Sequence, residues 1–335
     1  MTDYQSLIDA ETWAFIEQTN SYYPPDTVDH TIDQQRKVYN LMCRAFFAGY
    51  PDGVSAEDKQ IKSSGHTISI RRYRALRYDC RAMVLYYHGG GFVVGGLQSH
   101  DDICAEICHR TGYEVLSVDY RLSPEHKHPA AFEDALAAFE WAAVSYDLPI
   151  LLAGDSAGGN LAAAVAHHTR KNPCKPIGQM LIYPGLGGDM NRGSYIKHAN
   201  APMLTVRDLD FYKDIRTGGK DFSRDISYRP LADTDFSGLP PTIVITAECD
   251  PLSSDGEIYR DRIMAAGGKA WWHEEAGLVH GYLRARHSVA RARESFTRII
   301  DSIKALGRKE WTHPVVNQVR RGLARAKAEA VHPID

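Results

Sequence analysis

The stretch Gly154-Asp155-Ser156-Ala157-Gly158 closes one apolar run of the sequence, and His88-Gly89-Gly90-Gly91 closes an earlier one at 82–87. In a Gly-x-Ser-x-Gly sequence the serine occupies a sharp strand-to-helix turn, so its neighbours must be small enough for the chain to bend. A run of glycines lets backbone N–H groups approach an oxygen on which negative charge develops during attack on a carbonyl. Together the two motifs predict a nucleophile and an oxyanion hole.

The residues around the serine favour this interpretation. Residues 149–153 form a short apolar run, which is typical of a buried strand, and residues 160–170 are rich in alanine without Gly or Pro, which is typical of a helix. Gly-x-Ser-x-Gly alone occurs often by chance in a chain with 27 glycines. The prediction therefore depends on this strand-turn-helix context.

Six motifs in a fixed order make the chain similar to a known family. It resembles the hormone-sensitive-lipase-like α/β-hydrolases, in the subgroup whose nucleophile motif reads Gly-Asp-Ser-Ala-Gly. The motifs are the serine motif, the glycine motif extended to Phe92, and four further stretches: 119–126, 129–134, Asp250-Pro251-Leu252 and His280-Gly281-Tyr282. The resemblance spans roughly residues 60 to 305. It implies an α/β-hydrolase fold and a serine carboxylesterase.

The order of motifs also predicts a catalytic triad. A serine hydroxyl needs a base, and the base needs a carboxylate that holds its tautomer; in α/β-hydrolases both follow the serine along the chain. Asp250 is the predicted acid, because it lies on a loop just after the strand predicted at 242–247. Glu248 is the nearest alternative, but its closeness to the strand end favours a packing or hydrogen-bonding role.

Five histidines follow Asp250, at positions 273, 280, 287, 313 and 332. His273 is expected inside a strand, and His287 on a helix with basic neighbours. His280 follows the last predicted strand and precedes Gly281, which places it on a loop. His280 is therefore the predicted general base for Ser156.

The oxyanion hole and the substrate pocket complete the predicted site. The first donor is the backbone N–H of Ala157, the residue after the nucleophile. The resemblance assigns the other donors to Gly90 and Gly91. Large side chains near these motifs and in the segments outside the strand pattern are predicted to wall the acyl pocket: Phe92, Tyr22, Tyr23, Phe46, Met203, Leu204, Phe211 and Tyr212.

Strand-like and helix-like runs alternate through the middle of the chain, which predicts a mostly parallel, doubly wound sheet of the α/β class. The predicted strands are 66–75, 82–87, 114–119, 149–153, 178–183, 242–247 and 269–275. The predicted helices are 101–111, 130–146, 157–171, 254–266 and 283–305.

Three segments fall outside this alternation. Residues 1–50 carry many aromatic side chains without a strand pattern, and residues 185–239 are too long for a simple crossover. The resemblance implies that these two segments form a helical cap above a catalytic domain at 60–305. The basic, alanine-rich segment 306–335 is expected to be a C-terminal helical tail.

Charge and hydropathy argue against a nucleic-acid partner and against a membrane span. The 335 residues include 39 basic and 42 acidic ones, a net charge of −3, which argues against a nucleic-acid partner. No stretch approaches the roughly 20 apolar residues of a membrane span, and the first residues lack the pattern of a signal peptide, so a cytoplasmic location is expected. The expected partner is a small-molecule ester, and a homodimer is left open.

No metal or cofactor is predicted. The six cysteines lack Cys-x-x-Cys spacing, and the histidine pairs 126/128 and 167/168 have no Asp, Glu or Cys set at zinc-like spacing. A serine esterase also needs no cofactor.

The predicted reaction is hydrolysis of short- to medium-chain acyl esters through an acyl-enzyme. Amidase, deacetylase and lactonase activities remain alternatives, because their substrates share the tetrahedral intermediate. A non-catalytic ligand receptor with this fold is a second alternative, and a true lipase with an apolar mobile lid is a third.

Overall fold

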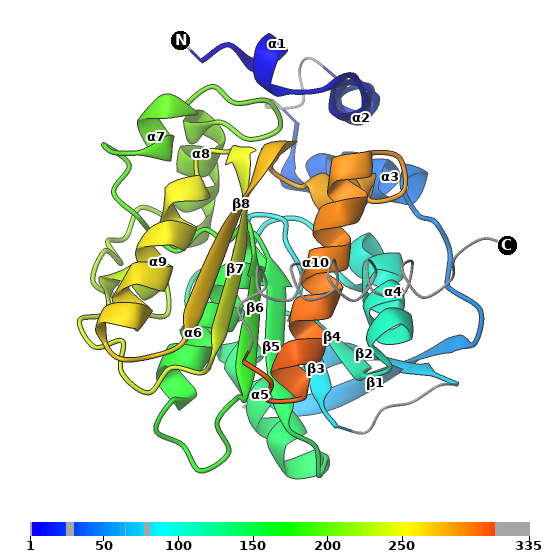
Figure 1. The fold of residues 1–335 in the computed structure, drawn as a ribbon, viewed down its shortest axis with the longest axis vertical. Coiled ribbons are helices and arrows are strands. Elements are labelled where there is room, and N and C mark those ends of the chain that lie inside the picture. Colours follow the sequence, from blue (N-terminus) through cyan, green and yellow to red (C-terminus); the bar gives the residue numbers. More distant parts are fainter. Residues whose placement is uncertain (1, 25–29, 64, 77–80, 312–335) are drawn as a thin grey trace, which may run out of the picture.

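The computed structural model describes residues 2–24, 30–63, 65–76 and 81–311, and these residues form one eight-stranded sheet with helices on both faces (Figure 1). The strands are β1 (Val54–Ser63), β2 (His66–Ala75), β3 (Met83–Tyr87), β4 (Glu114–Asp119), β5 (Ile150–Asp155), β6 (Gly178–Ile182), β7 (Thr242–Cys249) and β8 (Ala270–Val279).

The sheet has the strand order β1-β2-β4-β3-β5-β6-β7-β8. β1 pairs antiparallel with β2 and β2 pairs antiparallel with β4, whereas the pairs from β4 through β8 are all parallel. Every residue of β3, β5 and β6 is buried, as expected for central strands covered on both faces. The predicted fold class, a mostly parallel α/β-hydrolase sheet, is confirmed.

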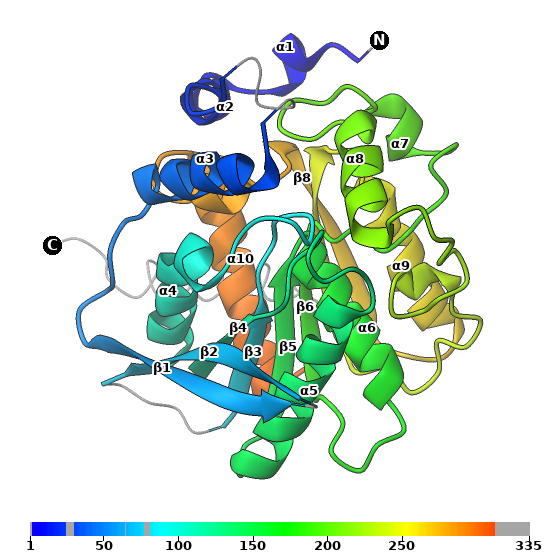
Figure 2. The ribbon, with the colours of Figure 1, turned by 180° about the vertical axis from the view of Figure 1, so that it is seen from behind.

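The helices are α1 (Tyr4–Leu7), α2 (Ala10–Asn20), α3 (Ile32–Ala45), α4 (Asp101–Thr111), α5 (Ala130–Ser145), α6 (Ala157–Thr169), α7 (Ser194–Lys197), α8 (Val206–Thr217), α9 (Ser253–Ala265) and α10 (Ala290–Gly307). Short 3₁₀ helices are η2 (Leu97–His100), η3 (Pro230–Ala232) and η4 (Tyr282–Ala285). α4 and α10 pack on one face of the sheet in one apolar cluster, and α5, α6 and α9 pack on the other (Figures 1 and 2).

Two predictions about elements are wrong. β1 was not expected, because only Ile61 among its residues is buried and the strand, at the edge of the sheet, therefore lacks an apolar signal. The predicted helix 283–305 is in fact two elements, since η4 ends at Ala285 and α10 begins at Ala290. His287 lies in the turn between them and not on a helix.

The two predicted cap segments contain the helices that lie at the carboxyl ends of the parallel strands. α2 and α3 come from the N-terminal segment, and α7 and α8 come from residues 185–239; all four lie at the end toward which β8 points (Figures 1 and 2). The sheet begins at Val54, so a domain boundary at residue 60 cuts through β1. Most of the predicted tail, residues 312–335, lies outside the described residues.

No helix in the described part of the chain is long and apolar enough to cross a membrane.

Candidate active site

Ser156 occupies a strained turn between β5 and α6. Its backbone has φ +54° and ψ −117°, which a residue other than glycine rarely adopts. The Ser156 N–H donates to the carbonyl of Ile182 at 2.9 Å and so fixes the turn to β6. A Cβ atom at Gly158 would overlap the carbonyl oxygen of Tyr87, and one at Gly154 would overlap that of Gly158. Both glycines are therefore required by the close approach of neighbouring backbone.

The structure brings the three predicted triad residues together in one hydrogen-bonded chain. His280 Nε2 lies 2.8 Å from Ser156 Oγ, and His280 Nδ1 lies 2.7 Å from Asp250 Oδ2. Asp250 follows the last residue of β7, and His280 follows the last residue of β8. The Asp250 side chain is fully buried, and its Oδ1 accepts a hydrogen bond from the Leu252 N–H at 2.8 Å. This geometry suits a nucleophile, a base and the carboxylate that orients the base.

The alternative candidates for the acid and the base have other partners in the structure. Glu248 Oε2 accepts a hydrogen bond from the Gly277 N–H at 2.8 Å, the kind of role expected for it. His273 lies in β8, and its Nε2 is 3.5 Å from Glu275. His287 Nε2 is 3.3 Å from Glu106, beside α4.

The predicted oxyanion donors surround the same serine. Gly90 has φ +126° and Gly91 has φ +60°, so the loop after β3 takes a path that favours glycine. A Cβ atom at Gly91 would lie 2.6 Å from the Tyr212 ring, so a side chain there would clash with α8. The Ala157 N–H belongs to the first turn of α6, whose N–H groups have no partner inside the helix. All three residues line the cavity that contains Ser156 and His280.

The chain is similar to proteins of a known family. A family model described as the α/β hydrolase fold matches residues 84–284, which is more than half of the chain. The chain belongs to this α/β-hydrolase family. The match also confirms the predicted resemblance to hormone-sensitive-lipase-like hydrolases.

Relatives of this α/β-hydrolase are named as esterases. The carboxylic ester hydrolase LipN of Mycobacterium tuberculosis is 35% identical over 269 residues, which are 76% of this chain and 71% of LipN. The carboxylesterase NlhH of the same organism is 38% identical over 239 residues, 68% of this chain and 74% of NlhH. A hyperthermophilic esterase from Pyrobaculum calidifontis has a similar structure, with a TM-score of 0.82, 32% identity, and coverage of 90% of this chain and 99% of that one.

Asp155, next to the nucleophile, anchors the glycine loop of this α/β-hydrolase. Its Oδ1 accepts hydrogen bonds from the Gly89 N–H at 2.9 Å and the Tyr86 hydroxyl at 2.8 Å. Burial alone would raise the pKa of Asp155, but the nearby His100 and the hydrogen bonds from His100 and Tyr86 outweigh it and hold that pKa well below its usual range. Asp155 is therefore an anionic anchor.

His88 supports the same loop. Its ring stacks on Tyr120 at 4.3 Å, and its Nδ1 lies 2.7 Å from the Gly89 carbonyl oxygen. Burial, and then the neighbouring His100, lower the pKa of His88 to about 3. The imidazole is therefore neutral at physiological pH, and its contacts fit a structural role in the loop.

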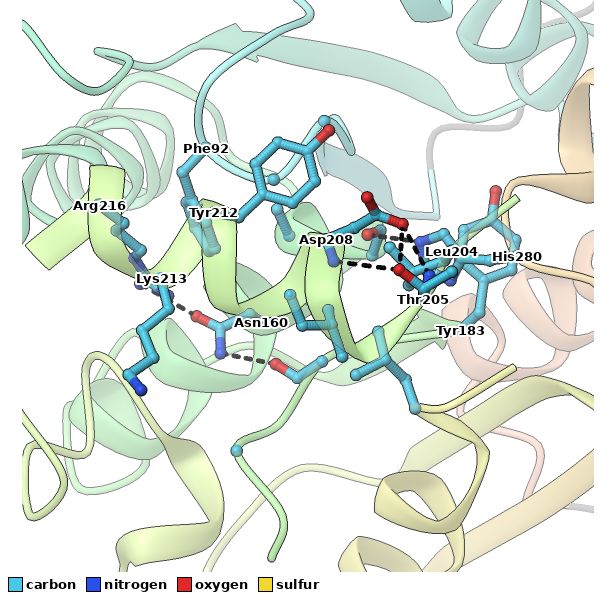
Figure 3. A pocket seen from close by; sticks show the side chains of 18 of the residues that line it. Phe92, Asn160, Tyr183, Leu204, Thr205, Asp208, Tyr212, Lys213, Arg216 and His280 are labelled. Atoms are coloured by element: carbon cyan, nitrogen blue, oxygen red, sulfur yellow. Dashed lines mark hydrogen bonds between the residues drawn. The ribbon is translucent and has the colours of Figure 1, made fainter. Parts of the chain in front are cut away.

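The cavity above Ser156 has a volume of about 1100 Å³, and both predicted cap segments contribute to its wall. Figure 3 shows part of the contribution of residues 185–239, including Leu204 and Tyr212. From the N-terminal segment come Tyr23, Tyr39 and Met42, among others. From residues 185–239 come Met203, Leu204 and Tyr212, among others.

Five of the eight predicted pocket residues line this cavity: Phe92, Tyr23, Met203, Leu204 and Tyr212. The structure does not bring the other three to its wall. Tyr22 lies in the turn after α2, and Phe46 packs with Phe15 in the apolar cluster of the sheet face, with 5.3 Å between ring centres. Phe211 is 38% exposed and contacts only the edge of Tyr212 among the described aromatic rings. A large side chain outside the strand pattern is therefore not enough to predict that a residue lines the pocket.

Sequence reasoning missed several polar residues of the cavity. Asn160, one turn after Ser156 on α6, donates to the carbonyls of Gly185 at 2.7 Å and Tyr228 at 3.0 Å. Arg216 of α8 also lines the cavity. Neither residue belongs to a motif, and the segments they meet are distant in sequence. In the described part of the chain, no group of three or more His, Cys, Asp or Glu side chains could hold a metal ion.

Proposed function

We propose that this α/β-hydrolase is a serine carboxylester hydrolase that works through an acyl-enzyme. The observation that carries the proposal is the continuous contact from Asp250 through His280 to Ser156, at 2.7 and 2.8 Å. The names of its relatives support ester hydrolysis as the reaction.

Each residue has one role in the proposed reaction. Ser156 Oγ attacks the ester carbonyl, and His280 Nε2 takes the hydroxyl proton. The tetrahedral oxyanion accepts hydrogen bonds from the backbone N–H groups of Gly90, Gly91 and Ala157. His280 then gives its proton to the leaving alcohol. Water repeats the sequence on the acyl-enzyme and releases the acid, while Asp250 keeps the imidazole oriented.

Esters are proposed over amides because an alcohol leaves more easily than an amine. Amide and lactone substrates would pass through the same tetrahedral intermediate. A non-catalytic receptor would not need a complete Ser-His-Asp triad. The preference for short to medium acyl chains follows from the predicted resemblance, with the cap segments setting the limit. A cytoplasmic location and a homodimer also remain predictions.

A panel of p-nitrophenyl esters from acetate to palmitate tests the proposal. We expect hydrolysis that is fastest for the shorter chains and that is lost in Ser156→Ala, which removes one oxygen and leaves the turn intact. Release of p-nitrophenol is followed by absorbance. Turnover by Ser156→Ala above a hundredth of the wild-type rate would contradict the assignment of the nucleophile, and a rate that jumps at the solubility limit of the substrate would favour a lipase.

A further inference from the structure

A buried arginine faces the proposed ester site. Arg216 of α8 is only 6% exposed and lines the cavity above Ser156 (Figure 3). Its guanidinium carbon lies 3.5 Å from the centre of the Phe92 ring and 4.3 Å from that of Tyr228. Phe92 directly follows the oxyanion glycines, and the guanidinium therefore lies in the wall of the same cavity as Ser156 and His280.

The guanidinium has no carboxylate partner among the residues that the structure describes. Its Nη2 donates one long hydrogen bond, 3.4 Å, to Asn160 Oδ1, and its Nε is buried without a partner in that part of the chain. A guanidinium has five N–H donors, and burying a cation without a counter-charge is costly. The aromatic faces offset only part of this cost.

Two arginines away from the cavity show the ion pairs that Arg216 lacks. The buried Arg286, which is 2% exposed, contacts both Asp102 and Glu106. The half-buried Arg72 forms two hydrogen bonds with Glu114.

The carboxylate that acts electrostatically on Arg216 is already hydrogen-bonded to other residues. Asp225 is close enough to act on its charge, but Asp225 Oδ2 lies 3.0 Å from His128 Nε2, and Oδ1 accepts hydrogen bonds from Ser227. Burial lowers the pKa of Arg216 to about 10, so the side chain stays charged at neutral pH.

The other two arginines that line the cavity make shorter hydrogen bonds to oxygens of the protein. Arg229 donates to the carbonyls of Gly187 and Gly188, and Arg284 donates to the Tyr39 hydroxyl, although Arg284 Nε, like that of Arg216, is buried without a partner in the described residues. Arg216, whose one side-chain hydrogen bond is 3.4 Å long, is therefore the arginine of this wall that the protein binds most weakly.

We propose that Arg216 binds a carboxylate carried by the ester substrate, on its acyl or its alcohol part, and so sets a preference for anionic esters. This inference rests on the proposed ester hydrolysis. A carboxylate would accept two parallel N–H groups of the guanidinium, a contact that a neutral group cannot reproduce. The expected preference over a neutral isostere is about tenfold to a hundredfold, the range of a charge-assisted hydrogen bond.

Two matched pairs of esters test the inference and locate the anion. Monomethyl glutarate and methyl glutaramate differ only in a carboxylate or amide on the acyl part. Para-acetoxybenzoate and para-acetoxybenzamide differ in the same way on the alcohol part. The measured quantity is the ratio of kcat/KM for the anionic ester to that for its neutral partner, in a pH-stat. A ratio above ten in the first pair places the carboxylate on the acyl part, and in the second pair on the alcohol part.

Three variants assign the preference to the charge. Arg216→Met keeps a long apolar side chain between the two rings and should lower the favoured ratio at least tenfold, whereas Arg216→Lys should retain part of it. Arg207→Met, an exposed arginine on the same helix, is the matched control and should leave the ratio as in the wild type. A ratio near one in the wild type for both pairs, or a high ratio that Arg216→Met leaves within twofold, would overturn the inference.

A binding measurement tests the inference without changing Arg216, in case the Arg216 variants do not fold. Calorimetry on Ser156→Ala should detect monomethyl glutarate or para-acetoxybenzoate binding at least tenfold more tightly than the corresponding amide. Equal affinities in both pairs would overturn the inference. A wild-type protein that hydrolyses none of the four esters would instead contradict the proposed function.

Discussion

One imidazole links the proposed nucleophile to its acid, because His280 lies 2.8 Å from Ser156 Oγ and 2.7 Å from Asp250 Oδ2. His280→Ala should therefore lower kcat by about 10⁴-fold or more, as is usual for triad residues. His273→Ala and His287→Ala are the matched controls and should keep most of the activity in the p-nitrophenyl ester assay. An inactive His287→Ala variant with an active His280→Ala variant would show that the base is misplaced.

Asp255 on α9 makes folding stability depend on pH. Its Oδ2 accepts hydrogen bonds from the Leu186 N–H at 2.7 Å and the Tyr195 hydroxyl at 3.0 Å, while Oδ1 has no partner in the described residues. Burial raises the pKa of Asp255 to about 6. Because the folded state prefers the protonated acid, this contribution to stability is present below the unfolded pKa of about 3.9 and is lost as pH rises through about 6.

Asp255→Asn should remove that dependence. Relative to the variant, the wild type should lose about 2 to 3 kcal/mol of unfolding free energy between about pH 4 and pH 7, since its pKa is raised by about two units. Urea unfolding of both proteins at the two pH values measures the difference. Parallel changes in wild type and variant would argue against a protonated Asp255.

The triad could be predicted from sequence, whereas Arg216 could not. Ser156, Asp250 and His280 each follow the end of a strand, and this position together with their order along the chain distinguishes them from the alternatives. The environment of Arg216 is made by Phe92 and Tyr228, which lie far from it in sequence and flank it only in the fold. An isolated arginine on a helix carries no local sign of such a position.

At the scale of elements, strands buried on both faces could be predicted from the sequence, whereas an exposed edge strand could not. The central strands are continuous apolar runs and were predicted within a few residues. β1 is an edge strand with mostly exposed polar residues, and therefore resembled a loop. The break between η4 and α10 was missed because 283–305 contains neither proline nor glycine to mark it.

The turn from β5 into α6 depends on Gly158. Helix propensity alone would make Gly158→Ala stabilising by about 1 kcal/mol, but the added Cβ would overlap the Tyr87 carbonyl. We expect a net loss of about 1 to 3 kcal/mol in unfolding free energy, as for overpacked sites. Gly185→Ala is the control, because its Cβ would lie 3.5 Å from Leu252, an ordinary contact. Equal stability of the two variants would show that the turn tolerates a side chain.

At the scale of the whole molecule, hydrogen bonds and an ion pair of Arg36 join the N-terminal segment to the region of the glycine loop. Arg36 of α3 donates to the carbonyls of Val93 at 2.8 Å and Ser123 at 2.9 Å, and it pairs with Glu125 at 2.8 Å. The sequence indicated that this segment buries aromatic residues. Which of them face the substrate depends on how α2 and α3 pack, and that is a property of the assembled fold.

Deletion of residues 1–45 should change the acyl-chain profile and raise KM, because the segment supplies part of the cavity wall. Arg36→Met is the milder variant and should shift both quantities in the same direction, since it releases α3 without removing it. Both are measured on the p-nitrophenyl ester panel. A folded deletion protein with the wild-type profile and KM would show that the segment is not part of the pocket.

Covalent labelling tests the acyl-enzyme mechanism most directly. A fluorophosphonate probe reacts with an activated serine hydroxyl, so intact-protein mass spectrometry should show one adduct per chain, and peptide mapping should place it on Ser156. The adduct should be absent in Ser156→Ala and form far more slowly in His280→Ala. A wild-type protein that hydrolyses esters but stays unlabelled, or carries the adduct on another residue, would contradict the Ser156–His280–Asp250 mechanism.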